Sequence, residues 1–296
     1  MHRALLLLTV LLSPLAGAEV SDPGVRMRVV GSDLLGLEFT KAVYDFSVRN
    51  RFDVALALDG SRPGLQQLRA GRAELALLML PGEEEVACED FERVALGYHC
   101  VFIVVRDDCP LESVTLAQLA GIFGTDGPQI ARWSELGLEG EWSTSRVAPL
   151  APATGSGVGL ELFRHVVLGE RALKSEVVHY KDEADFARHL AGTSRPLALT
   201  TVRPDERHKV KLLAVTRGPQ SAAFLPTPEN LHTGNYPLRL PLRALFRRDT
   251  VARAPAVRGL LKFLLGEDAI GPLARAHVVP AAPALRAEQL AALEKL

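Results

Sequence analysis

Cysteine is scarce in this sequence. The 296 residues include three cysteines, Cys88, Cys100 and Cys109, which are too few for a disulfide framework. Cys100 lies in an apolar run and is interpreted as a small core residue. Cys88 and Cys109 flank that run, and an extended strand would hold them far apart, so we do not expect them to pair.

An excess of charge is also lacking, since the formal net charge is −1. This balance argues against a bulk electrostatic role on nucleic acid or on an anionic membrane. The eight histidines are scattered, and no Cys/His spacing resembles a metal site. No internal repeat or low-complexity tract is present. We therefore expect no nucleic-acid partner and no cofactor.

Long hydrophobic runs are limited to the N-terminal region. His2 and Arg3 precede a short apolar run, which ends before Ala16-Gly17-Ala18. This order is typical of a secretory signal peptide, here predicted over 1–18, and the run is too short for a stable membrane anchor. No cysteine follows the cleavage site, so lipid attachment is not expected. We expect a soluble periplasmic or secreted protein after cleavage.

Strand-like and helical segments alternate along the first part of the chain. Apolar strands are predicted at 27–30, 53–58 and 74–80, with helices at 35–50 and 65–70 between them. The third of these strands is apolar enough to be buried on both faces. A βαβαβ order predicts a parallel sheet with helices on its faces, and such sheets bind ligands beyond the carboxyl ends of their strands.

Three strand-to-helix turns carry glycine and serine at that end, at Gly31-Ser32, Gly60-Ser61 and 154–157. The third turn opens a segment with helical spacing. A glycine-rich turn leaves the N–H groups of the helix start without intrahelical partners, and the helix dipole favours an anion there. A serine-capped helix after a flexible turn would explain any one of them. Three in one chain favour a binding site, although the simpler reading stays open.

An enzyme is the less favoured alternative. Ser156 has the chemistry of a nucleophile, but His165 follows it by nine residues, about two and a half helical turns. That separation is too long for a hydrogen bond between them along one helix. No paired carboxylates or oxyanion arrangement stand out, so we expect no catalytic activity.

The second part of the chain continues the alternation after a break. A long strand is predicted at 95–105, and charge with proline at 106–110 then ends it. The return to the first part is placed in a segment rich in Pro, Gly and Asn, at 216–234. Further elements are expected at 115–124 (helix), after Ser156 (helix), 176–179 (strand), 183–190 (helix), 197–202 (strand), 255–265 (helix), 272–277 (helix) and 281–296 (helix).

The order of these motifs resembles the phosphate-binding proteins of bacterial ABC phosphate importers, which are type II periplasmic binding proteins. The similarity extends over nearly all of the chain after the signal peptide. The matching segments are Val30-Gly31-Ser32, Gly60-Ser61 with Gly64-Leu65, 116–123 with Trp133 and Leu136, Gly155-Ser156-Gly157 with Phe163, 234–238 with Pro241-Leu242, and 257–265 with Gly271 and 278–280.

The resemblance implies an α/β fold with two lobes and mixed, mostly parallel sheets flanked by helices. The strand–helix alternation and the breaks near Asp107 and Gly218 predict lobe I at 19–105 and 218–296, and lobe II at 106–217. The protein would be a monomer that captures a small anion, phosphate or a related oxyanion, and delivers it to an ABC permease. The expected ligand-binding residues are Ser32, Asp33, Ser61, Arg62, Thr154, Gly155, Ser156 and Gly157.

Four positions depart from the family pattern. Pro152 stands where the family has an arginine, and Val158 and Thr154 replace a threonine and an aspartate of the same motif. Met79 replaces the aspartate that accepts a proton from bound phosphate in the family. A bidentate arginine is among the strongest anion contacts, so its loss predicts weaker phosphate binding. Arg62 is a candidate replacement for the missing cation.

The same departures support a second interpretation. In it the chain is a degenerate homologue that no longer captures phosphate and serves as an exported accessory, sensor or interaction protein. Asp33 would favour this interpretation because its charge repels an anion. The retained serines favour the solute-binding interpretation.

Overall fold

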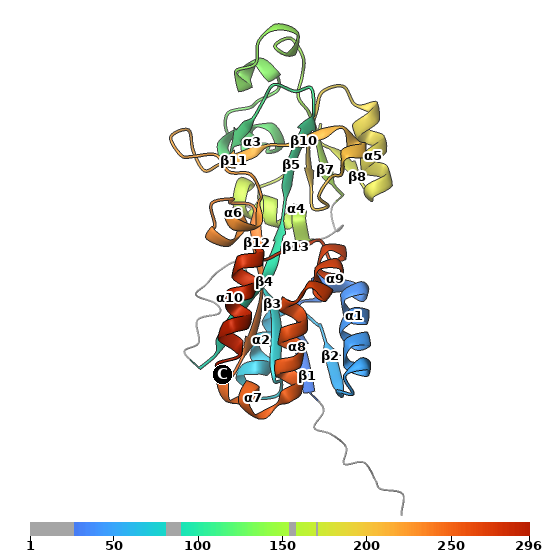
Figure 1. Cartoon of the computed structure of the whole chain (residues 1–296). Helices are drawn as coiled ribbons and strands as arrows, with labels where there is room; N and C mark the ends of the chain where they lie inside the picture. Colours follow the sequence, from blue (N-terminus) through green and yellow to red (C-terminus); the bar gives the residue numbers. More distant parts are fainter. Residues whose placement is uncertain (1–26, 81–89, 154–157, 170) are drawn as a thin grey trace, which may run out of the picture.

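The chain folds into two α/β units that lie one above the other (Figure 1). The structure is a computed structural model that describes residues 27–80, 90–153, 158–169 and 171–296. The predicted signal peptide at 1–18 and the predicted turn at 154–157 lie outside these residues. Within the described ranges, no helix is long and apolar enough to cross a bilayer.

The first unit is built on a six-stranded sheet in the order β13-β4-β12-β3-β1-β2. Its strands are β1 (Met27–Gly31), β2 (Val54–Ala57), β3 (Leu75–Met79), β4 (Glu92–Cys100), β12 (Arg239–Phe246) and β13 (Val278–Pro280). Its helices are α1 (Gly36–Arg49), α2 (Ser61–Arg69), α7 (Arg248–Arg253), α8 (Pro255–Leu265), α9 (Ile270–Arg275) and α10 (Pro283–Leu293).

The side chains of β3 point alternately to the two faces of this sheet, and both faces are covered. Leu75 and Leu77 belong to the core that includes Phe39 of α1, whereas Ala76 and Leu78 pack with the apolar residues of α2. Successive strand residues point to opposite faces, so a continuous apolar run requires two covers. The predicted burial of this strand on both faces is confirmed, since all five of its residues are buried.

The second unit contains a five-stranded sheet in the order β10-β5-β9-β7-β8 and a two-stranded sheet of β6 and β11. The strands are β5 (Phe102–Arg106), β6 (Ser113–Thr115), β7 (Ala148–Pro152), β8 (Val178–Tyr180), β9 (Pro196–Thr200), β10 (Val210–Leu212) and β11 (Ala214–Thr216). The helices are α3 (Leu116–Phe123), α4 (Val158–Phe163), α5 (Glu183–Gly192) and α6 (Pro228–Thr233). A π-helix, Arg164–Leu168, extends α4.

The sheets are mixed, as predicted, but parallel pairing is not in the majority. Among the described strands, five neighbouring pairs are parallel and five are antiparallel. In the two larger sheets, β1 pairs in parallel with β2 and β3, and β7 pairs in parallel with β8 and β9. The antiparallel pairs arise mainly from β4, β5 and β12.

The prediction of a single strand at 95–105 is wrong. β4 ends at Cys100 in the first sheet, and β5 begins at Phe102 in the second. The break lies at Val101, whose N–H donates to Leu238 O at 3.0 Å and whose carbonyl accepts from the Tyr236 hydroxyl at 2.6 Å. The chain therefore passes between the sheets four residues before the predicted boundary at 105.

The return of the chain to the first sheet is formed by β12, which the sequence analysis did not predict as a strand. Pro241 argues against a central strand because it cannot donate to a ladder. In the structure Pro241 stands opposite Tyr98 of β4 and lies beyond the ladder with β3, which begins at Leu242. The segment around Phe224 still pairs with Val215 of β11, so the chain stays with the second unit past the predicted boundary at 218.

A close approach of backbones fixes the end of β1. Gly31 has φ of 152°, a conformation that side-chain-bearing residues rarely adopt. A Cβ at Gly31 would lie 2.0 Å from Leu77 O. Gly60 N–H donates to Gly31 O at 2.8 Å, and a Cβ at Gly64 would lie 3.0 Å from Gly31 Cα. Glycine at these positions lets the start of α2 lie directly against β1 and β3.

A buried histidine lies on β4 at the edge between the units. His99 Nδ1 lies 3.1 Å from the carbonyl oxygen of His277, which can only accept, so Nδ1 carries the proton. Burial and the nearby His277 lower the pKa of His99 to about 4. The imidazole is therefore neutral in the fold at pH 7.

We expect Gly31→Ala to destabilise the fold by about 3 kcal/mol, since the added methyl group overlaps the β3 backbone and the φ value is unfavourable. Urea unfolding measures the change. Gly192→Ala is the matched control, because nothing lies within 4 Å of a Cβ there. Equal stability of the two variants would contradict the close approach.

We expect stability to fall as the pH is lowered from about 6.5 to about 4, because the unfolded chain protonates His99 before the folded chain does. The loss from this group between pH 7 and pH 5 is about 2 kcal/mol. Urea unfolding at both pH values should show a smaller loss in His99→Phe than in the wild type. An equal loss of stability in the wild type and in His99→Phe would mean that His99 takes up its proton at the same pH in the folded and the unfolded chain.

Candidate functional site

A cavity of about 450 Å³ lies between the two units. One side is formed by the strand ends and helix starts of the first unit, and the other by α4 and the π-helix of the second. This position matches the expectation that ligands of such sheets bind beyond the strand ends. The lining residues are Ser32, Asp33, Leu34, Ser61, Arg62, Met79, Val158, Glu161, Leu162, His165 and Leu240.

Ser32 holds the turn after β1. Its N–H donates to Leu77 O at 2.8 Å, and its Oγ accepts from the N–H of Leu34 at 3.3 Å. The side chain therefore caps the 3₁₀ turn Asp33–Leu35. Ser32 borders the cavity but is fully buried, so its first role is to shape the wall.

Ser61 is more open to the cavity, since it is only half-buried at the first residue of α2. Its Oγ accepts from the N–H of Met79 at 2.9 Å and so joins the start of α2 to the end of β3. A hydroxyl group has one hydrogen to donate and two acceptor positions. The bond to Met79 uses an acceptor position, which leaves the Ser61 hydrogen for a ligand in the cavity.

The second unit contributes one face of α4 and the π-helix. Val158, Glu161, Leu162 and His165 follow the spacing of neighbouring residues on a helix surface, which is why they line the same side. Neither Glu161 nor Leu162 is among the site residues predicted from the sequence, and His165 is a candidate there only as a partner of Ser156. The helical spacing that starts after the glycine-rich turn is the sequence signal that indicates these residues as neighbours on one helix face.

The cavity contains charges of both signs. Arg62 supplies a guanidinium group, whereas Asp33 and Glu161 supply carboxylates, and all three residues are exposed. Glu161 forms an ion pair with Arg164 at 3.1 Å. A free oxyanion would meet both attraction and repulsion here.

The residues that depart from the family pattern do not all lie in the same cavity. Met79 lines the cavity and is buried, so a thioether takes the place expected for a proton acceptor. Val158 also lines it. Pro152 lies at a neighbouring cavity of about 120 Å³, and its carbonyl accepts a hydrogen bond from His179 Nδ1 at 3.0 Å.

The structure brings together Ser32, Asp33, Ser61 and Arg62 of the predicted site residues. The other four, Thr154, Gly155, Ser156 and Gly157, lie outside the described residues, so their place in the site stays a prediction. In the part of the chain that the structure describes, no group of three or more His, Cys, Asp or Glu side chains could hold a metal ion.

Comparisons with known proteins agree with this architecture. Protein SphX from Synechococcus elongatus is 22% identical over 232 residues, which cover 75% of this chain and 67% of that protein. A possible phosphate-binding protein from Planctomyces limnophilus superposes with a TM-score of 0.69 at 19% identity, covering 91% of this chain and 98% of its own. An ABC-type phosphate transport receptor from Vibrio cholerae gives 0.65 at 18% identity, with 86% and 99% covered.

The two solved structures show the fold, which is that of two-lobed binding proteins, and the predicted α/β class is confirmed. The family model described as a PBP superfamily domain matches residues 18–268, which is most of the chain. This chain therefore belongs to the PBP superfamily.

Proposed function

We propose that this protein is an exported substrate-binding protein that captures a small oxyanion between its two lobes and delivers it to an ABC importer. The relatives named above include a possible phosphate-binding protein and a phosphate transport receptor, which supports phosphate or a related oxyanion as the ligand. Export is proposed from the predicted signal peptide at 1–18.

The observation that carries the proposal is the cavity between the units. Ser61 offers a hydroxyl hydrogen and Arg62 a cation at the start of α2, and α4 of the other unit faces them across the cavity. A ligand held by both sides would stabilise a closed arrangement of the lobes, because its contacts with both sides form only on closure. This is the behaviour required of a capture protein.

The alternative is a homologue that no longer captures phosphate and acts as an exported accessory, sensor or interaction protein. Met79 and Glu161 favour it, since neither side chain attracts an oxyanion. Calorimetric titration with phosphate, sulfate and small carboxylates separates the two proposals. Heat of binding with any of these anions supports capture, and its absence for all of them supports the alternative.

We expect Arg62→Ala to weaken anion binding by at least about tenfold, because a hydrogen bond to a charged group is lost. The fall of affinity with added salt should also disappear, since the attraction between Arg62 and the anion is removed and the charges of Asp33 and Glu161 only repel it. Titrations at low and high ionic strength measure both effects.

Arg69→Ala is the matched control, because Arg69 lies at the other end of α2 and outside the cavity lining. It should leave the affinity unchanged. If the wild type binds phosphate at submicromolar affinity and Arg62→Ala binds equally well, another residue carries the recognition.

A further inference from the structure

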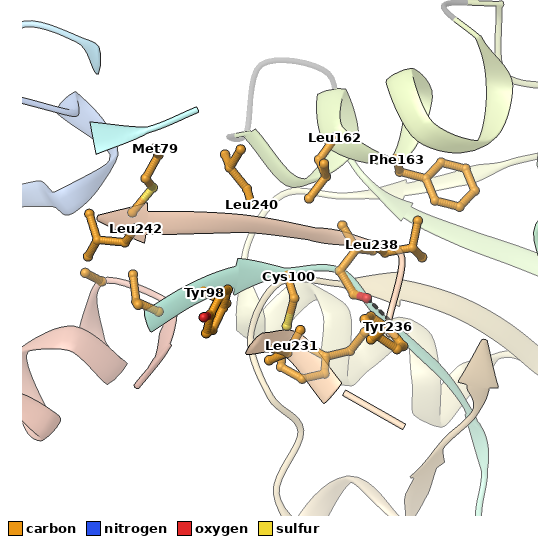
Figure 2. Packing of buried hydrophobic residues seen from close by; sticks show 14 of the residues in the cluster. Met79, Tyr98, Cys100, Leu162, Phe163, Leu231, Tyr236, Leu238, Leu240 and Leu242 are labelled. Carbon is orange, nitrogen blue, oxygen red and sulfur yellow. Dashed lines mark hydrogen bonds between the residues drawn. The ribbon is translucent and has the colours of Figure 1, made fainter. Parts of the chain in front are cut away.

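Part of the cavity wall is apolar and comes from three separate elements. Met79 of β3, Leu240 of β12 and Leu162 of α4 lie in a row in Figure 2. Their exposed fractions are 4%, 5% and 6%, so they are held in place by the core behind them. The half-buried side chains of Leu34 and Val158 add to this wall.

This wall provides nothing for a bare inorganic anion. An ion that moves against apolar side chains loses hydration without gaining hydrogen bonds, which costs free energy. The volume of about 450 Å³ also falls in the range of roughly 300–1,000 Å³ that is typical of sites for organic ligands. The cavity thus has room for more than phosphate, and the apolar chemistry of its wall favours a ligand that carries an apolar part.

The polar groups are concentrated at the start of α2, where Ser61 and Arg62 lie next to each other. Ser61 keeps a hydrogen to donate, and Arg62 carries the positive charge. Glu161 on the opposite side forms an ion pair with Arg164. Among the described lining residues, Ser61 and Arg62 are thus the neighbouring pair that attracts an anion, Asp33 and Glu161 are carboxylates that repel one, and the apolar wall provides a second surface.

We infer that the ligand is an organic oxyanion with an apolar body, whose charged head lies at Ser61 and Arg62 and whose alkyl or aryl part packs against Met79, Leu162 and Leu240. This inference rests on the proposed function, since it takes the cavity to be an oxyanion site. Burial of the apolar part offsets the affinity lost with the family's charged contacts. Met79 then acts as a packing surface in place of a proton acceptor.

The test is a series of titrations of the full chain with inorganic phosphate and with methyl-, propyl- and pentylphosphonate. We expect affinity to rise roughly fourfold for each added methylene group, as expected for burial of apolar surface. The heat-capacity change of binding should become more negative along the series. Phosphate should bind more weakly than pentylphosphonate.

Leu162→Asn should flatten the dependence of affinity on chain length, so that the ratio of pentylphosphonate to methylphosphonate affinity falls below that of the wild type. Leu37→Asn is the matched control, because Leu37 is 79% exposed on α1 and lies outside the cavity lining. If Leu162→Asn does not fold, the chain-length series and the heat capacities of the wild type decide the matter. A chain-length dependence equal in folded Leu162→Asn and the wild type overturns the inference.

The outcomes for the wild type separate this inference from the proposed function. Phosphate binding as tight as pentylphosphonate, with no chain-length dependence, overturns the inference and leaves the oxyanion site standing. If neither phosphate nor any phosphonate binds, the oxyanion site itself is wrong, and the inference is overturned with it.

Discussion

The pairing of β4 with β12 is the interaction on which the arrangement of the two units depends. These strands are far apart in the chain, yet they pair from Cys100 with Arg239 to Glu92 with Phe246. Beyond the ladder, the chain at Val101 remains bonded to Leu238 and Tyr236. The chain passes between the two sheets twice, at Val101 and in the segment that leads into β12, and these hydrogen bonds hold the two segments together. The cavity lies beside them, and Leu240 of β12 forms part of its wall.

A second constraint acts at the corner of the first sheet. Gly31 permits the backbone of β1 to approach β3, and Ser61 joins the start of α2 to Met79 at the end of β3. Backbone approach and side-chain bonding together place Ser61 and Arg62 at the cavity. The same residue types that suit a phosphate site therefore also serve the packing of the fold, so their presence alone does not define the ligand.

The cavity combines polar groups at strand-to-helix turns with apolar side chains. The turn after β1 and the start of α2 line the cavity, whereas Met79 brings an apolar surface where the resemblance implies a proton acceptor. Glu161 and Leu162 complete the opposite wall. Specificity in such a cleft is decided by the side chains that meet across it, and these come from elements distant in the chain.

The sequence by itself determined the α/β class, the alternation around β1–β3 and the grouping of Ser32, Asp33, Ser61 and Arg62, because these depend on local periodicity and on turns at strand ends. It did not reveal β12, since Pro241 argues against a central strand, nor the break at Val101. Only the tertiary structure decided those features and the apolar wall of Met79, Leu162 and Leu240. The physical reason is that each arises from contacts between segments remote in the chain, which no local pattern encodes.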